Sequence, residues 1–228
     1  MSRLNINRTF IFLLFMTPLS LLSQEGKVGN WIMYFGANKI SEQFSLHTEI
    51  QFRNHTIVPN NTEQLLLRTG LNYHFSNKAF ATAGYAYIPS YVFESEQSAP
   101  ESKEHRIWQQ FILKNNIGRV FFEHRYRLEQ RWVNSDFRSR FRYRLMLMIP
   151  IGKPKIEKGS FFIGLYDEIF VNSKNVFFDR NRLYGALGFQ INSITSIQTG
   201  MLYQRVNDFG KWYLQFALVF NPDFRNKK

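Results

Sequence analysis

Residues 119–149 read RVFFEHRYRLEQRWVNSDFRSRFRYRLMLMI, and charged and apolar side chains alternate along most of this segment. The charged members fall on odd positions before residue 133 and on even positions after residue 136: Glu123, Arg125, Arg127, Glu129, Arg131, Arg138, Arg140, Arg142 and Arg144. A period of two is typical of β-strands, whose successive side chains point to opposite faces. The segment therefore predicts two strands joined as a hairpin through residues 133–136, with one basic face and one apolar face.

The class of protein depends on which face of this hairpin points inward. A soluble sheet hides its apolar face, whereas a membrane barrel turns that face toward lipid and arranges its charged residues around the lumen. In the membrane case the register is strongly enforced, because one arginine facing lipid at the midplane costs about 2–4 kcal/mol. We expect the membrane arrangement, and a soluble exported barrel of the lipocalin type stays open as the alternative.

The same alternation recurs along the rest of the chain, in about eleven runs separated by Gly, Asn, Ser and Pro. The runs are about 9–13 residues long, which suits tilted strands that cross a bilayer. The fold class that we predict is all-β: an antiparallel up-and-down transmembrane β-barrel of 10 to 12 strands. We prefer twelve strands, because single-chain bacterial barrels have even strand numbers.

Two places within the predicted strands need separate comment. Gly84 interrupts a tyrosine-rich run, which indicates a close packing contact or a β-bulge. Residues 104–113 do not alternate cleanly, because Ile107-Trp108 and Gln109-Gln110 break the pattern. The faces of that strand are therefore left unassigned.

The N-terminus has the composition of a secretory signal peptide over residues 1–23, followed by a single barrel domain over residues 24–228. Arg3 and Arg8 supply positive charge, residues 10–22 are apolar, and cleavage is expected near Ser23-Gln24. An uncleaved anchor is the alternative, but the apolar run is shorter than the roughly 20 residues that a spanning helix needs.

The composition narrows the choice of partners. The chain has no cysteine, which fits an exported protein without disulfides, and 17% of its residues are aromatic. Its formal net charge of +12 falls by two when the signal peptide leaves. Because the basic residues alternate with apolar ones inside strands, instead of clustering on a helix or loop, a nucleic-acid partner is disfavoured. Lumen carboxylates and anionic lipid head groups account for the basic residues better.

The charged faces of the predicted strands converge on the barrel lumen, where arginines and carboxylates are expected to form one charge network. Its predicted members are Glu49, Arg53, Arg68, Glu104, Glu123, Arg125, Arg127, Glu129, Arg131, Arg138, Arg140, Arg142, Arg144, Glu168 and Arg182. Side chains fill the lumens of small barrels, so we favour a packed, hydrogen-bonded plug. The alternative is a narrow pore, and its surplus of arginine would favour anions.

Several blocks of sequence resemble a known family. They are Glu104-His105-Arg106-Ile107-Trp108-Gln109-Gln110, His124-Arg125-Tyr126-Arg127-Leu128-Glu129-Gln130-Arg131-Trp132, Phe137-Arg138-Ser139-Arg140-Phe141-Arg142-Tyr143-Arg144, Glu168-Ile169-Phe170-Val171-Asn172 and Asn181-Arg182-Leu183-Tyr184. Together they are similar to domain-of-unknown-function family 2490. The resemblance implies a bacterial outer-membrane β-barrel and supplies no activity. We expect a monomer in outer-membrane lipid, with small anionic solutes or a periplasmic or surface protein as candidate partners.

An outer-membrane lipid-modifying enzyme is the sharpest functional alternative. Asn181-Arg182-Leu183-Tyr184 resembles the strand that carries the catalytic Asn of outer-membrane phospholipase A. That family also needs His and Ser two residues apart on the preceding strand, where residues 166–170 of this chain contain neither. His124 and Ser139 share the apolar face of neighbouring strands, but no orienting carboxylate is evident.

No catalytic, cofactor-binding or metal-binding residues are expected. His47, His55, His74 and His105 lack the spacing of metal ligands. Asp167 and Glu168 are adjacent, so in a strand they point to opposite faces and do not share an ion easily.

Overall fold

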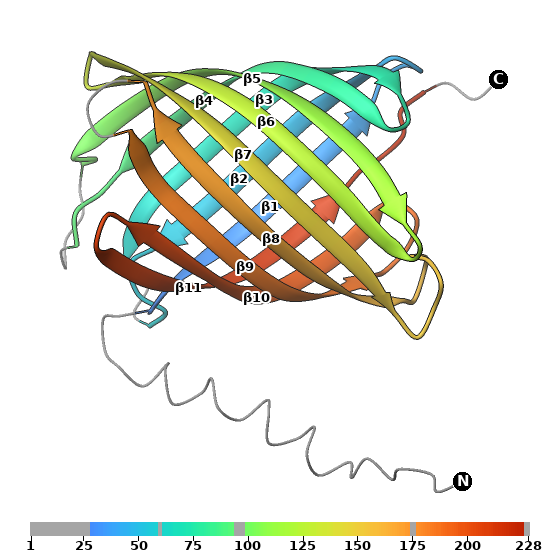
Figure 1. Ribbon diagram of the computed structural model, residues 1–228. Helices are drawn as coiled ribbons and strands as arrows, with labels where there is room; N and C mark the ends of the chain where they lie inside the picture. The colour runs from blue at the N-terminus through green and yellow to red at the C-terminus, as the bar shows by residue number, and fades with distance from the viewer. Residues whose placement is uncertain (1–27, 59–60, 94–98, 174–176, 226–228) are drawn as a thin grey trace, which may run out of the picture.

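The strands of this chain close into a barrel with no free edge (Figure 1). The computed structural model describes residues 28–58, 61–93, 99–173 and 177–225, so the expected signal peptide and its cleavage site lie outside the described residues. Within the described part the strands are β1 (Val28–Lys39), β2 (Phe44–Asn54), β3 (Thr62–Ser76), β4 (Ala79–Ser90), β5 (Ser102–Ile117), β6 (Val120–Val133), β7 (Asp136–Ile151), β8 (Phe161–Asn172), β9 (Phe178–Gln190), β10 (Thr195–Val206) and β11 (Phe209–Phe220). The predicted all-β barrel is confirmed.

The closure of the barrel differs from the usual even-numbered arrangement. Consecutive strands pair antiparallel, but β1 and β11 run parallel, from Val28 opposite Trp212 to Gly36 opposite Phe220. The eleven strands of the described residues lie within the expected range of ten to twelve, although the preferred number of twelve is not observed. An odd number makes the first and last strands run in the same direction, and a parallel ladder still satisfies the backbone groups of both edges.

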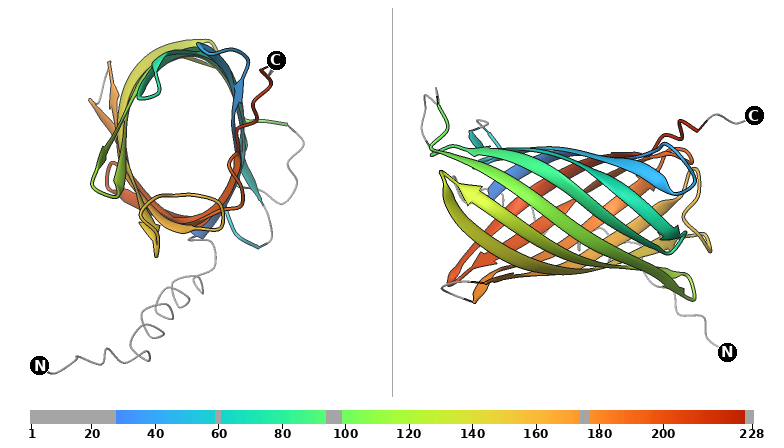
Figure 2. Two further views of the ribbon diagram at one scale, coloured as in Figure 1. Left: turned by 90° about the vertical axis from the view of Figure 1, so that its right-hand side faces the viewer. Right: turned by 90° about the horizontal axis from the view of Figure 1, so that it is seen from above.

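Because the strand number is odd, the start of β1 and the end of β11 lie at opposite ends of the barrel (Figure 1). The C-terminal rim, where β11 ends, holds the connections 40–43, 77–78, 118–119, 152–160 and 191–194. The N-terminal rim, where β1 begins, holds the turns 134–135 and 207–208 and the described residues 55–58, 91–93 and 99–101. The left view of Figure 2 looks along the barrel from the C-terminal rim. The hairpin predicted through residues 133–136 is confirmed, with φ of 47° at Asn134 and 79° at Ser135, which are the positive values of a tight hairpin turn.

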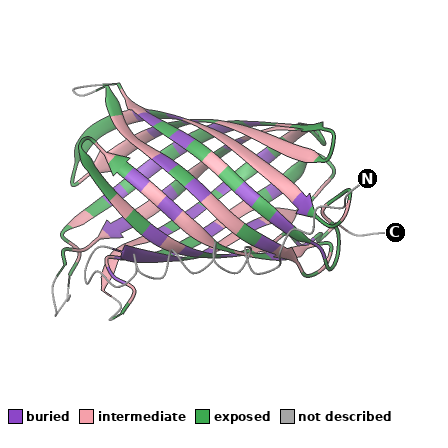
Figure 3. Cartoon of the chain, turned by 60° about the horizontal axis from the view of Figure 1, so that its bottom comes forward, coloured by how far each residue is buried: buried purple, intermediate pink, exposed green. Residues whose placement is uncertain are grey.

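The two faces of the strands differ sharply in chemistry. Buried and exposed positions alternate along the strands (Figure 3). Large apolar side chains on the outside include Ile50, Phe52, Leu67, Leu71, Phe111, Leu128, Phe141, Leu165, Leu183, Leu187, Phe216 and Leu218. Among the described residues, no helix is long and apolar enough to cross a membrane. The inner face, in contrast, carries buried charged side chains such as Glu49, Arg127 and Glu129, which is the reverse of a lipocalin-type interior.

The structure of strand β5 explains why its inner and outer faces could not be assigned from the sequence. Glu104 and Arg106 point inward as their charge suggests, but Trp108 lies on the same inner face and is completely buried. Ile107 on the outer face is 46% exposed. Alternation alone does not distinguish an apolar residue that points into the barrel from one that points outward.

Trp108 owes its place to two glycines on neighbouring strands. Gly84 lies directly opposite both Gly70 and Trp108 in the sheet. A Cβ atom on Gly84 would meet the Thr69 carbonyl oxygen at 2.2 Å and Trp108 Cε2 at 2.8 Å. The strand pairing is in continuous register at Gly84, so its role is close packing and not a β-bulge.

Candidate functional site: a charge network in the lumen

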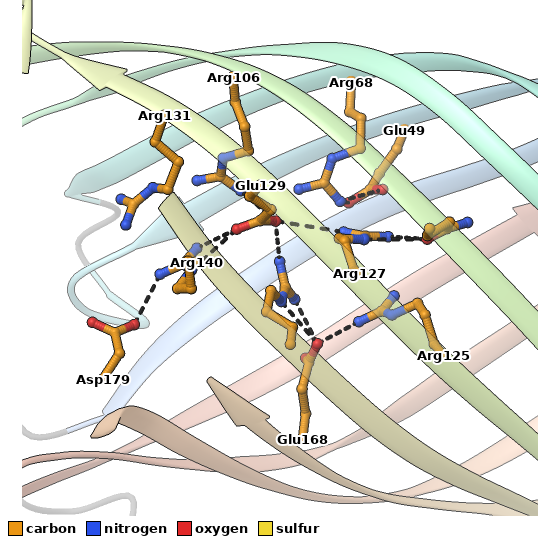
Figure 4. A network of polar contacts seen from close by, with 12 residues as sticks. Glu49, Arg68, Arg106, Arg125, Arg127, Glu129, Arg131, Arg140, Glu168 and Asp179 are labelled. Atoms are coloured by element: carbon orange, nitrogen blue, oxygen red, sulfur yellow. Dashed lines mark hydrogen bonds and ion pairs between the residues drawn. The ribbon is translucent and has the colours of Figure 1, made fainter. Parts of the chain in front are cut away.

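Glu129 is the centre of a network of ion pairs inside the barrel (Figure 4). Its carboxylate is completely buried and accepts hydrogen bonds from three arginines on strands β5 and β7. Arg106 Nη1 lies 3.0 Å and Arg142 Nη1 2.7 Å from Oε1, and Arg140 Nη2 lies 2.7 Å from Oε2. Arg127 Nη1 lies 3.9 Å from Oε1. One buried carboxylate therefore faces four guanidinium groups, which requires further carboxylates nearby.

Glu168 on β8 supplies one of these further carboxylates. Its Oε1 accepts hydrogen bonds from Arg142 Nη2 at 2.7 Å and from Arg125 Nη2 at 2.6 Å. Arg142 thus bridges Glu129 and Glu168, and the network extends from β5 to β8. These bonds join charged groups, which makes them stronger than bonds between neutral groups.

The network continues toward the N-terminal rim through two more carboxylates. Glu104 accepts a hydrogen bond from Arg131 Nη2 at 2.8 Å and one from Arg106 Nε at 2.8 Å. Asp179 accepts one from Arg140 Nη1 at 2.9 Å. This half of the lumen is crossed by a continuous set of charge-assisted hydrogen bonds.

On the other side of the barrel, Glu49 forms a smaller cluster. Arg68 Nη1 lies 2.8 Å from Glu49 Oε2, and His47 Nε2 lies 3.0 Å from the same oxygen. Arg53 donates to the amide oxygens of Gln51 and Gln64. Polar amides therefore complete the cluster where carboxylates do not reach.

Aromatic rings supply the remaining contacts of the arginines. The guanidinium carbons of Arg68 and Arg127 lie 5.4 and 4.8 Å from the ring centroid of Trp108. Those of Arg53 and Arg182 lie 4.1 and 4.9 Å from Trp31. A cation over an aromatic face is stabilised by the ring quadrupole, and more so where water is excluded. The ring of Phe170 makes the same kind of cation–π contact with the guanidinium groups of Arg140, Arg142, Arg180 and Arg182.

The structure brings most of the predicted network residues together. The predicted arginines with a carboxylate partner inside the barrel are Arg68, Arg125, Arg127, Arg131, Arg140, Arg142 and Arg144, and the predicted acceptors are Glu49, Glu104, Glu123, Glu129 and Glu168. Arg53 and Arg182 are held by amides and rings instead. Arg138 does not join the network: its side chain is 61% exposed and lies 3.6 Å from Asp136.

Arg106, Asp179 and the aromatic rings belong to the network but were not predicted from the sequence. Arg106 lies two residues after Glu104, so the period of two would have placed it on the same inner face. Asp179 has the parity of the outer face, but the register of β8 and β9 shifts between Phe170 and Val171, which leaves Asp179 without a partner position. That bulge lets Asp179 reach Arg140, and no parity rule detects it.

The residues of the enzyme alternative lie apart on the outer face. In the register of β6 and β7, His124 is opposite Leu145 and Ser139 is opposite Gln130. The two residues are therefore six positions apart along the strands, or about 20 Å. His124 Nδ1 instead lies 2.9 Å from the Tyr143 hydroxyl.

Asn181 on the outer face has structural partners. Its amide donates hydrogen bonds to Asp167 Oδ1 at 2.5 Å and to the Glu168 carbonyl oxygen at 3.2 Å. Asp167 points out of the barrel while Glu168 points in, as expected for adjacent strand residues. No group of three potential metal ligands occurs among the residues that the structure describes.

A cavity of about 380 Å³ lies in the lumen beside the network, and we call it the lumen cavity. It extends from Arg142, Glu168 and Arg182 to residues near the C-terminal rim, such as Phe121 and Asn221. On the opposite side, a second cavity of about 470 Å³ lies at the N-terminal rim and includes Arg131, Arg138 and Asp179. The ion-pair network lies between these two cavities.

Comparison with known proteins yields one match. The model of a family described as protein of unknown function (DUF2490) matches residues 28–215. Neither the curated proteins nor the solved structures gave a match to the chain.

Proposed function

We propose, for a chain that belongs to the DUF2490 family of proteins of unknown function, the role of an outer-membrane β-barrel with a plugged lumen and no catalytic residues. The observation that carries the plug is the burial of Glu129, whose side chain is 0% exposed among arginines from β5, β6 and β7. Because a barrel of this size has a lumen that side chains can fill, these contacts leave little room for a continuous water path. The protein acts as a structural or binding element.

The outer face of the barrel supports the membrane location. Apolar side chains such as Leu165, Leu183 and Phe216 are 40–51% exposed and lie on strands 12 or 13 residues long. A soluble protein would leave this continuous apolar surface in water, whereas a bilayer covers it. Asp167 is a polar exception, and its hydrogen bond to Asn181 reduces the cost of facing lipid.

Electrophoresis without prior heating tests the membrane location. A membrane barrel remains folded in detergent and migrates differently from the heated sample. Identical migration of both samples, together with recovery of the protein in the soluble fraction, would favour an exported soluble barrel. N-terminal sequencing of the mature protein tests the proposed signal peptide, with Gln24 expected as the first residue.

Single-channel recording in planar bilayers tests the plug. We expect no conductance steps at any voltage, because breaking the Glu129 contacts would leave buried charges without partners. Anion-selective conductance steps would contradict the plug and support a narrow pore. The pore is the second candidate function, because the lumen cavity is lined by more cationic than anionic side chains.

A lipid-hydrolysis and deacylation assay tests the absence of catalysis. We expect the wild-type protein to release no acyl chains, because His124 lies beside Tyr143 and far from Ser139. If the wild-type protein released acyl chains and His124→Ala or Ser139→Ala abolished that release, the protein would be an enzyme.

A further inference from the structure

The lumen cavity has two chemically different parts. Its inner part is lined by arginines and carboxylates of the network. Its outer part, toward the C-terminal rim, is lined mainly by Phe35, Phe80, Phe121, Met146 and Met148, together with Lys114, whose Nζ lies 5.0 Å from the Phe80 ring centroid. Phe80 and Phe121 are second residues of β4 and β6, and Phe121 lies opposite Met148 in the sheet. The cavity is therefore basic at its floor and apolar along its wall.

The lumen cavity as a whole carries an excess of positive charge. Eight cationic side chains line the cavity (Arg53, Arg68, Lys114, Arg125, Arg127, Arg142, Arg144 and Arg182), against three carboxylates (Glu49, Glu123 and Glu168). Arg125 and Arg144 lie directly opposite each other on β6 and β7, an arrangement that destabilises a sheet when the charges are alike. Arg144 pairs with Glu123, whereas Glu168, which pairs with Arg125, is shared with Arg142, so three arginines face two carboxylates here. One more negative charge would balance this part of the floor.

The same arginines have donors without acceptors. The buried atoms Arg68 Nε, Arg125 Nε, Arg127 Nη1 and Arg144 Nε have no hydrogen-bond partner among the described residues. Buried donors are nearly always paired in folded proteins, and an unpaired one is costly. Arg125 and Arg144 have side chains 11% and 17% exposed, more than Arg127 at 1% or Arg142 at 7%. They are therefore more accessible to a ligand in the cavity than Arg127 and Arg142.

The apolar wall narrows the class of ligand. Barrel interiors that hold water are polar, so a wall of phenylalanine and methionine inside a lumen calls for an apolar occupant. Methionine adapts its shape to flexible ligands. A volume of about 380 Å³ lies within the usual range of small-molecule sites.

We propose that the lumen cavity binds an amphiphilic anion through its basic floor and its apolar wall. The anionic group lies at Arg125 and Arg144, and the hydrocarbon chain runs along Met146, Met148 and Phe121 toward the C-terminal rim. This site goes beyond the plug, since it gives the barrel a ligand and a side from which that ligand enters. It does not depend on whether the barrel conducts.

Titration calorimetry with octanoate tests the site. The full-length mature protein is placed in nanodiscs of zwitterionic lipid, and empty discs provide the blank for partition into lipid. We expect saturable binding of octanoate, at least about tenfold tighter than binding of acetate, octanol or octylammonium, a difference of about 1.4 kcal/mol. These comparisons use the wild-type protein, so they do not depend on the folding of a variant. A protein that stays outside the discs is titrated in solution, which separates failure of the membrane location from failure of the site.

A matched pair of variants locates the site. Arg125→Gln removes one charge next to Glu168, which keeps Arg142, and Arg131→Gln removes one charge next to Glu104, which keeps Arg106. Arg131 is not among the residues that line the lumen cavity. We expect Arg125→Gln to weaken octanoate binding about tenfold or more and Arg131→Gln to change it less than about twofold. Met148→Asn is expected to weaken octanoate binding and leave acetate binding unchanged.

Three results would overturn the proposal. They are no saturable heat above the empty discs, equal binding of octanoate and octylammonium, and equal weakening by Arg125→Gln and Arg131→Gln. Heat-modified migration of each variant serves as the control for folding.

Discussion

Arg138 and Arg140 are two residues apart on β7 and have the same inward parity, yet their surroundings are different. Arg140 is 4% exposed and lies 2.7 Å from Glu129 and 2.9 Å from Asp179. The Arg138 side chain is 61% exposed, and Asp136, which lies 3.6 Å away, is itself 78% exposed. Parity along a strand selects the face, whereas height along the barrel decides whether a residue is enclosed.

This difference in enclosure determines what each ion pair contributes to stability. An exposed pair contributes about 0–1 kcal/mol, because water and salt screen it. A buried pair contributes little relative to an apolar replacement, but the loss of one partner leaves a charge without compensation. The centre of the lumen is therefore sensitive to substitution and its rim is tolerant.

The largest effect is expected at the centre, from Glu129→Gln. This change removes the charge that faces Arg106, Arg140 and Arg142, and we expect the free energy of unfolding to fall by about 3–5 kcal/mol. Urea unfolding in lipid vesicles measures it. Asp136→Asn at the N-terminal rim is the control, and an equal loss in both variants would contradict the distinction between centre and rim.

A substitution on the outer face tests the other side of the same wall. Leu165 is 40% exposed and lies in the middle of β8. If lipid covers it, Leu165→Arg is expected to lower the free energy of unfolding by about 2–4 kcal/mol in vesicles. Leu165→Ser is the control for the lost apolar side chain. A soluble barrel would tolerate the arginine, because it would face water.

Packing under the network is tested by Gly84→Ala. The added Cβ would meet backbone atoms at 2.2 and 2.8 Å, which forces Trp108 and its neighbours to shift. We expect a loss of about 1–3 kcal/mol and a changed near-ultraviolet circular dichroism spectrum. Gly164→Ala, whose nearest contact would be an ordinary 3.5 Å, is the matched control and is expected to be tolerated. An unchanged spectrum in Gly84→Ala would show that Gly84 does not determine the position of Trp108.

The smallest effect is expected from Arg138→Gln. Since this side chain is exposed, the free energy of unfolding is expected to change by less than about 0.5 kcal/mol. The same urea unfolding measures it. A loss comparable to that of Glu129→Gln would mean that Arg138 is enclosed after all.

Much of this architecture follows from the period of two in the sequence. The alternation from Arg125 to Arg131 and from Arg138 to Arg144 predicts which side of β6 and β7 is basic, and the predicted barrel places that side in the lumen. The position of Trp108 does not follow, because it depends on Gly70 and Gly84 on other strands. The contact of Asp179 with the network could not be predicted either, because a register shift between β8 and β9 breaks the alternation of faces at this residue.

The strand count shows a different kind of limit. The alternation gave about eleven runs, and the preference for twelve came from the even numbers of other barrels. Whether β1 and β11 pair depends on contacts between residues at opposite ends of the chain, and no local pattern reports those. The enclosure of Arg140 relative to Arg138 is likewise a matter of position along the barrel axis, which alternation does not encode.

The parallel seam between β1 and β11 has a consequence for assembly. It joins residues 28–36 to residues 212–220, so one edge of β1 stays unpaired until a segment more than 170 residues later in the sequence reaches it. Contacts between such distant segments form slowly, since a long loop must close first. Removal of β11 would expose two edges at once, and a truncated chain would be a template for aggregation instead of a smaller barrel.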